Sequence, residues 1–197
     1  MYLRTLAAAV AAVTLSAAAH AALPVYSTPG VESATPNAFV STGTGVVTAY
    51  FAGFDAGFDS RIGLSINGNA PAVFGLLNKT SALGQSLNLG SANVGDTLEL
   101  ILEVNGGSEF FSTTKADNAD GFNHAFSTFY AGGDFGIPAG IFVAFEDING
   151  GGDSDYNDHR FVFTFPGAVP EPGTWMMLIT GFGMVGVAAR GRKRIAA

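Results

Sequence analysis

The apolar stretches in the middle of this 197-residue chain are short, and their shortness most limits the folds open to it. Each is about five to eight residues long and stops at or near glycine, asparagine or aspartate, which favour turns. They are rich in β-branched and aromatic residues, as strands are. We therefore expect strands at residues 46–51, 61–66, 97–104, 141–145 and 161–165.

Residues 97–104 have the clearest strand pattern, because leucines and a valine at the even positions alternate with a mostly polar set at the odd positions. Asn67-Gly68 predicts a tight turn between two strands. No stretch of the middle region reads as a long helix. We expect residues 22–168 to form an all-β domain, an antiparallel, jelly-roll-like β-sandwich with Phe142 or Val143, Phe161 and Phe163 in its core.

Charge is unevenly distributed along the chain. The middle region has four Lys or Arg residues against fifteen acidic ones, a net charge of −11. Such a surface repels nucleic acid and anionic lipid headgroups and attracts divalent cations. The chain has no cysteine, which excludes disulfides and thiolate metal sites.

The N-terminus has the parts of a secretory signal peptide. Arg4 precedes an apolar run at residues 5–19, and Ala19-His20-Ala21 is a small-x-small cleavage site. A membrane-spanning helix is the alternative, but the run is short for one. We expect residues 1–21 to be removed by signal peptidase, with cleavage after Ala21.

The C-terminus has the parts of a membrane anchor. Residues 173–189 are uncharged and predict a single transmembrane helix, slightly shorter than a ~30 Å hydrocarbon core. A basic cluster follows at residues 190–194 and should stay in the cytoplasm. The notable residues of this segment are Pro170, Glu171, Pro172, Trp175, Arg190, Arg192, Lys193 and Arg194.

Residues 169–194, with Pro-Glu-Pro, a tryptophan, a glycine-containing apolar helix and a basic end in that order, resemble the PEP-CTERM sorting signal of Gram-negative bacteria. The resemblance implies recognition by an exosortase, a membrane-embedded processing enzyme. It also implies delivery from the inner membrane to the cell surface or the exopolysaccharide matrix. A plain C-terminal anchor without processing is the alternative.

An acidic loop joins two of the expected strands. Five carboxylates and two side-chain amides lie between residues 146 and 158, together with three consecutive glycines. Without a cation these carboxylates would repel one another, and calcium takes six to eight oxygens of this kind. The spacing does not fit an EF-hand, because Asp158 stands at the sixth loop position and Thr164 at the twelfth.

The sequence FEDINGGGDSDYND at residues 145–158, followed by a Phe/Val strand, resembles the hallmark of the DUF4114 family of secreted β-domains. Residues 117–125 resemble another family segment, and the likeness covers residues 49–165, best from 96 onwards. It implies a calcium site, for which Asn157 is either a ligand or a turn residue. The implied carboxylate ligands are Glu146, Asp147, Asp153, Asp155 and Asp158.

Some residues near these motifs are weaker candidates. His159 and Arg160 stand where the family usually has apolar residues, and Arg160 would offset part of the loop's charge. Asp120 is either functional or a turn residue, and His124 either functional or a hydrogen-bonded core histidine. We expect Asp55 and Asp59 to be turn acids.

Two functions remain open from the sequence. The first is a non-catalytic surface or matrix protein that adheres to polysaccharide or to another copy of itself. The second is a carbohydrate-active enzyme with paired carboxylates among Glu99, Glu103 and Glu146. No serine stands in a nucleophile elbow and no phosphate-binding glycine motif appears, so we favour the non-catalytic function.

Overall fold

The computed structural model describes residues 21–167, which form ten strands and three short 3₁₀ helices. The strands are β1 Phe39–Val40, β2 Gly45–Gly53, β3 Ser60–Ile66, β4 Phe74–Gly75, β5 Ser86–Ala92, β6 Thr97–Val104, β7 Glu109–Ser112, β8 Ala125–Tyr130, β9 Gly140–Phe145 and β10 His159–Thr164. The helices are η1 Lys115–Asp117, η2 Asp134–Gly136 and η3 Asn149–Gly151. In this part of the chain no helix is long and apolar enough to cross a membrane. The predicted membrane helix at 173–189, the sorting tail and the signal peptide before Ala21 lie outside the described residues.

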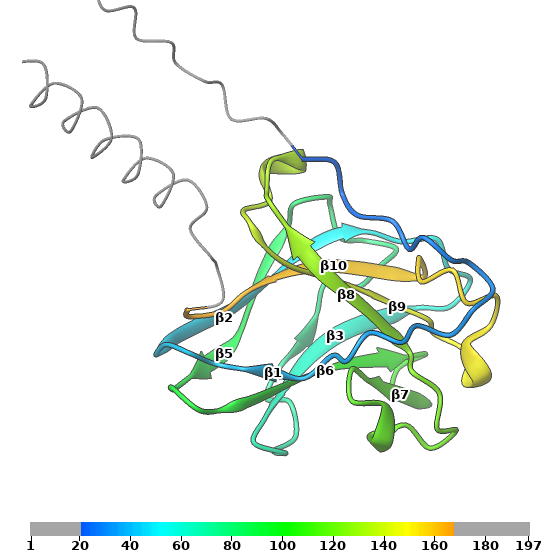
Figure 1. Cartoon of the computed structure of the whole chain (residues 1–197), viewed down its shortest axis with the longest axis horizontal. Coiled ribbons are helices and arrows are strands. Elements are labelled where there is room, and N and C mark those ends of the chain that lie inside the picture. The colour runs from blue at the N-terminus through cyan, green and yellow to red at the C-terminus, as the bar shows by residue number, and fades with distance from the viewer. Residues whose placement is uncertain (1–20, 168–197) are drawn as a thin grey trace, which may run out of the picture.

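The strands form two antiparallel sheets packed face to face (Figure 1). The first sheet has the order β1-β6-β3-β4, with β7 also paired to β6, and the second has the order β5-β2-β10-β9-β8. The all-β, antiparallel sandwich is therefore confirmed. All five strands expected from the sequence are present, and Asn67 and Gly68 both have positive φ, as a tight hairpin turn requires.

The strand order differs from the jelly-roll-like order that we expected. β8, β9 and β10 are hydrogen-bonded in sequence, and β3–β4 and β6–β7 are also consecutive neighbours. In a jelly roll the last strands of the chain alternate between the two sheets, whereas β8, β9 and β10 all lie in the second sheet. The loops between them, residues 131–139 and 146–158, each contain a 3₁₀ helix and return to the same sheet.

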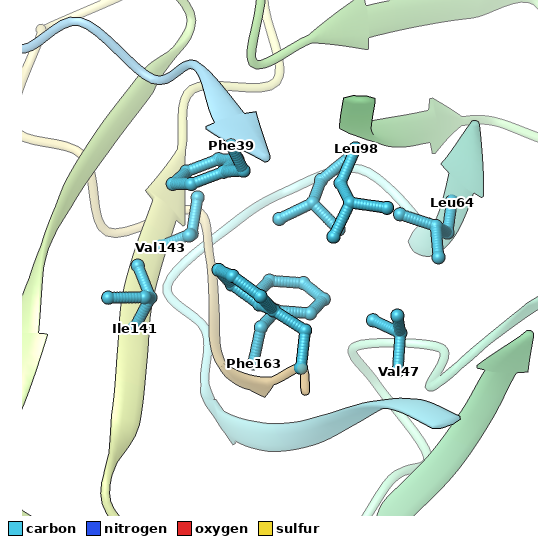
Figure 2. A pocket seen from close by; sticks show the side chains of 9 residues that line it. Phe39, Val47, Leu64, Leu98, Ile141, Val143 and Phe163 are labelled. Atoms are coloured by element: carbon cyan, nitrogen blue, oxygen red, sulfur yellow. The ribbon is translucent and has the colours of Figure 1, made fainter. Parts of the chain in front are cut away.

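The main core lies between the two sheets. The predicted alternation in β6 is confirmed, since Leu98, Leu100, Leu102 and Val104 are at most 4% exposed. Phe161 and Phe163 of β10 face them from the second sheet. Figure 2 shows part of this core, where side chains of both sheets surround a cavity of about 10 Å³ with a wholly apolar lining. A space of that size and polarity stays dry.

A second apolar cluster covers the outer face of the second sheet. Phe142, Ala144 and Val162 point to this face, where Tyr26 of the N-terminal segment packs against Tyr156, with ring centroids 4.7 Å apart. Val143 and Phe145 point the other way, into the main core. β9 and β10 are therefore buried on both faces, and the loop between them extends from the most enclosed part of the fold.

Candidate metal centre

The acidic loop leaves β9 at Phe145 and enters β10 at His159, at one end of the sandwich (yellow in Figure 1). Its backbone is tightly coiled, because Ser154 and Tyr156 have φ values of 54° and 55° and three glycines before them also have positive φ. Non-glycine residues rarely adopt this conformation, and such residues cluster at functional sites. The coil folds the second half of the loop back over Glu146.

Glu146 is the most enclosed acid of the loop, at 1% exposure. Its Oε1 accepts a hydrogen bond from the backbone N–H of Tyr156. Its Oε2 is buried and has no hydrogen-bond partner among residues 21–167. A Cβ atom added to Gly152 would lie 3.3 Å from Oε2, so this glycine leaves the space beside that oxygen free.

Glu146, Asp153 and Asp155 converge. Each offers one carboxylate oxygen, and these oxygens all lie within 4.8 Å of one another. Two oxygens bound to the same calcium ion lie at most about 5 Å apart, which is twice the calcium–oxygen bond length. The three carboxylates can therefore share one ion with little rearrangement.

The proximity of these acids changes their proton affinity. Burial, together with the carboxylates of Asp158, Asp153 and Asp155, raises the pKa of Glu146 to about 8. Burial and the neighbouring Asp153 also raise the pKa of Asp155. Arg160 offsets only part of this charge, because it acts to lower the pKa of Asp155 while that pKa stays raised. A divalent cation relieves the remaining repulsion.

Asp147 and Asp158 form a separate pair beside the cluster. The backbone N–H of Asp147 donates to Asp158 Oδ2 at 3.0 Å, and Asp147 Oδ2 is buried without a hydrogen-bond partner within the described chain. Burial and the carboxylate of Asp147 raise the pKa of Asp158 to about 7, and burial raises the pKa of Asp147. Of the five carboxylates expected to be ligands, the structure brings three together and places two in this pair.

Asn157 orients Asp155. Its backbone N–H donates to Asp155 Oδ1 at 3.1 Å, and its side-chain amide donates to Oδ2 of the same residue. These bonds are those of a turn residue, which is one of the two roles left open by the sequence. They hold the Asp155 carboxylate beside Asp153.

Asp120 and His124 hold the acidic loop from outside. Asp120 Oδ2 accepts the backbone N–H of Gly150 at 2.7 Å, and His124 Nδ1 lies 3.0 Å from the carbonyl oxygen of Glu146. His124 is fully buried and stacks on Phe111 with ring centroids 3.9 Å apart. It is thus a hydrogen-bonded core histidine, and both residues position the loop.

Tyr156 positions the acidic loop, a role that was not expected from the sequence. Its hydroxyl donates to the carbonyl oxygen of Asn123 at 2.6 Å and accepts the backbone N–H of Ser33 at 2.9 Å. The loop is thereby fixed to two other segments by one buried side chain. The available signal was the single aromatic residue within an otherwise polar loop.

The remaining acidic and basic candidates lie around the loop. The backbone N–H of Asp55 bonds the carbonyl oxygen of Asn157 at 3.0 Å, and Asp59 pairs with Lys79 at 2.8 Å. Burial lowers the pKa of His159 to about 3, so it is a neutral core residue at physiological pH. Arg160 lies over Gly53, where a Cβ would come within 2.9 Å of the guanidinium.

Glu99 and Glu103 are both engaged in other contacts. Glu103 is bound by Arg61 through two hydrogen bonds, of 2.9 and 3.1 Å, and Glu99 accepts the hydroxyl of Ser112. They lie four residues apart on β6, which separates their Cα atoms by about 13 Å. Glu146 lies in the loop and not on this strand.

Family models match two parts of the chain. Residues 83–165, which span β5 to β10 and the acidic loop, match a domain of unknown function, DUF4114. Residues 168–193 match the PEP-CTERM protein-sorting motif. The chain is a PEP-CTERM protein with a DUF4114 domain. No protein of curated function and no solved structure matches it.

The PEP-CTERM motif decides the route of the protein. It is exported and sorted by an exosortase, as the resemblance in the sequence implied. The DUF4114 match begins at residue 83, earlier than the region from residue 96 where the sequence likeness was best. The acidic loop thus belongs to the matched domain.

Proposed function

We propose that this PEP-CTERM protein is a non-catalytic component of the cell surface or exopolysaccharide matrix of a Gram-negative bacterium, with one calcium ion bound in its acidic loop. Residues 173–189 hold it in the inner membrane until exosortase acts on the tail. Glu146, Asp153 and Asp155 supply the central oxygens of the calcium site. Asp147 and Asp158 supply a second row of carboxylates next to it.

One observation supports the calcium site above the others. Glu146 is buried, yet its Oε2 has no hydrogen-bond partner in the described part of the chain. The Glu146 carboxylate also lies close to the carboxylates of Asp153 and Asp155. An unpaired buried carboxylate costs several kcal/mol, and a bound cation removes that cost. The raised pKa of Glu146 has the same origin, since burial and the neighbouring carboxylates both disfavour its ionised form.

Calcium fits this site better than the other common divalent ions. The oxygens come from a coiled, glycine-rich loop without regular geometry, which calcium tolerates and magnesium does not. No cysteine is present in the chain, and the nearby His124 ring is already engaged by two acceptors. A zinc site therefore lacks its usual ligands.

The engagement of the other acids supports a non-catalytic role. Glycosidases need two carboxyl groups between about 5 and 9.5 Å apart on either side of a substrate. Glu99 and Glu103 lie farther apart along one strand, and Arg61 neutralises Glu103. Glu146 is 1% exposed and is enclosed by its own loop.

The test is a thermal melt of the full chain, purified in detergent, with chelator and with several millimolar calcium. At a hundredfold excess over Kd a ligand stabilises the native state by ~2.7 kcal/mol, which raises Tm by roughly 5–10 °C. Asp153→Asn combined with Asp155→Asn should remove most of this shift. The same pair should be neutral or stabilising in chelator, because it relieves repulsion.

The matched control is Asp59→Asn with Asp117→Asn, which removes two exposed carboxylates outside the loop. This variant should retain the calcium shift. Equal wild-type melting temperatures in calcium and chelator would contradict the calcium site. An equal loss of the shift in both double variants would assign the effect to general charge and not to the loop.

A further inference from the structure

The outer face of the first sheet carries a groove of about 510 Å³ between β3, β4, β6 and the segment after β4. None of the acids of the acidic loop lines it. Its walls combine aromatic, charged and hydroxyl side chains. Those that matter here are Arg61, Phe74, Thr80, Ser81, Gln85 and Glu103.

The floor of the groove includes the Phe74 ring, with the guanidinium carbon of Arg61 5.7 Å from the ring centroid. Gly63 of β3 pairs with Phe74 of β4, and a Cβ on Gly63 would lie 2.7 Å from the phenyl ring. The missing side chain lets the ring lie down on the sheet. Phe110 of β7 extends this aromatic surface, with ring centroids 6.1 Å apart, and is 53% exposed. Exposed aromatic rings held in place are typical of binding surfaces.

The charges in the groove cancel. Arg61 binds Glu103 through Nε and Nη2, and Lys79 binds Asp59 at 2.8 Å. Glu103 is 5% exposed, so this planar pair is fixed, and neither hydrogen bond uses Nη1 of Arg61. The groove is thus a neutral region in a domain of net charge −11.

We propose that this groove binds a neutral polysaccharide through its hexopyranose rings. The apolar C–H face of a pyranose packs on an aromatic ring, and its hydroxyls hydrogen-bond to fixed planar groups and to serine and threonine hydroxyls. A polyanion is disfavoured by the acidic domain around the groove. This ligand class adds detail to the proposed matrix role. It rests on that role in one respect, because the extracellular matrix is where the protein would encounter the polysaccharide.

The test measures binding of the full chain, purified in detergent, to immobilised cellulose, β-1,3-glucan, xylan, mannan and starch, with polygalacturonate as the anionic comparator. At least one neutral polymer should retain the protein. Phe110→Ala should weaken that binding about tenfold, which corresponds to ~1.4 kcal/mol. Arg61→Lys should also weaken it, because lysine cannot hold the planar pair.

Phe129→Ala is the matched control, since Phe129 is a 41% exposed phenylalanine on the second sheet. It should leave binding unchanged. Retention by polygalacturonate alone, by no polymer, or equally by both phenylalanine variants would overturn the proposal. Sedimentation of the free protein tests the competing outcome, in which Phe110 joins two copies of the chain and its replacement yields monomers without affecting polymer retention.

Measuring retention in calcium and in chelator separates the two proposals. A calcium-dependent melting temperature without polymer binding would contradict the polysaccharide proposal and support the calcium site. Polymer binding without a calcium-dependent melting temperature would contradict the calcium site and support the polysaccharide proposal.

Discussion

His124 and Asp120 are joined by a partly buried contact in which His124 Nε2 lies 2.8 Å from Asp120 Oδ2. The other ring nitrogen, Nδ1, faces the backbone carbonyl oxygen of Glu146. The pair therefore connects the turn at Asp120 to the first residue of the acidic loop.

Asp120 should give the fold a defined sensitivity to acid. Burial acts to raise its pKa, but hydrogen bonds from the N–H groups of Gly150 and Phe122 and from His124 lower it to about 2, below the ordinary 3.8. A depressed carboxyl pKa stabilises the fold above the unfolded value and ceases to do so as pH falls through the folded value. Asp120→Asn should thus be less stable than wild type at pH 6, with the gap closing between pH 4 and 2.

Urea unfolding across that pH range measures the effect. The carboxylate of Glu32 also has a lowered pKa, and because the charge of Asp120 acts to raise that pKa, Glu32 contributes a smaller change of opposite sign in the variant. Asp117→Asn, at an exposed position of the same segment, is the control and should track wild type. If the difference in unfolding free energy between wild type and Asp120→Asn stayed constant down to pH 2, the lowered pKa of Asp120 would not be its cause.

Phe163 should be a major contributor to the core. It is 1% exposed and borders the apolar cavity of Figure 2, so truncation enlarges a space that already exists. Phe163→Ala should lower the free energy of unfolding by ~3–5 kcal/mol. Denaturant melts of this variant beside Phe129→Ala, which removes an exposed ring, provide the check. Similar losses in both would mean that β10 does not face the core.

Gly152 should tune the calcium response. A methyl group there would lie 3.3 Å from Glu146 Oε2 and intrude on the oxygen proposed to bind the ion. Gly150→Ala is the matched control, because Gly150 also has positive φ but a Cβ there meets no neighbouring atom within 4 Å. Both variants should be less stable in chelator. The calcium-induced rise in Tm should shrink in Gly152→Ala and persist in Gly150→Ala.

The mature protein should lack its basic end. In a host with an active exosortase, intact-mass analysis of surface protein should find a chain without Arg190, Arg192, Lys193 and Arg194. The same measurement in a strain without exosortase should find them retained. Surface protein that keeps these residues in the first host would contradict processing of the tail.

The strands were predictable where burial left a pattern in the sequence. β6 alternates because one face meets the core, and β9 and residues 161–163 of β10 are continuously apolar because both of their faces are covered. β5 was not predicted, since its Asn, Ser and Gly residues lie at the edge of the sheet, the strand itself contains a bulge, and edge strands need little apolar character. β8 is another edge strand, with half-exposed positions along most of its length.

The candidate ligands were predictable as a set, but their grouping was not. Glu146 and Asp147 are neighbours in sequence and point to opposite sides of the extended chain, so one joins Asp153 and Asp155 while the other joins Asp158. The left-handed residues Ser154 and Tyr156 decide which acids turn back. Nothing in a serine or tyrosine signals such a conformation, because it is imposed by the tertiary contacts of the Tyr156 hydroxyl.

The position of β10 has a consequence for how this protein leaves the cell. β10 lies in the middle of the second sheet and pairs with β2, more than one hundred residues earlier in the chain. Until that last strand is available, β2 has β5 as a neighbour but lacks its other neighbour. The two apolar clusters to which β10 contributes also remain incomplete. Such distant pairing also makes folding slow. A chain that crosses the membrane with its N-terminus first therefore stays unfolded until nearly all of the domain has crossed. The β-sandwich is completed only after export.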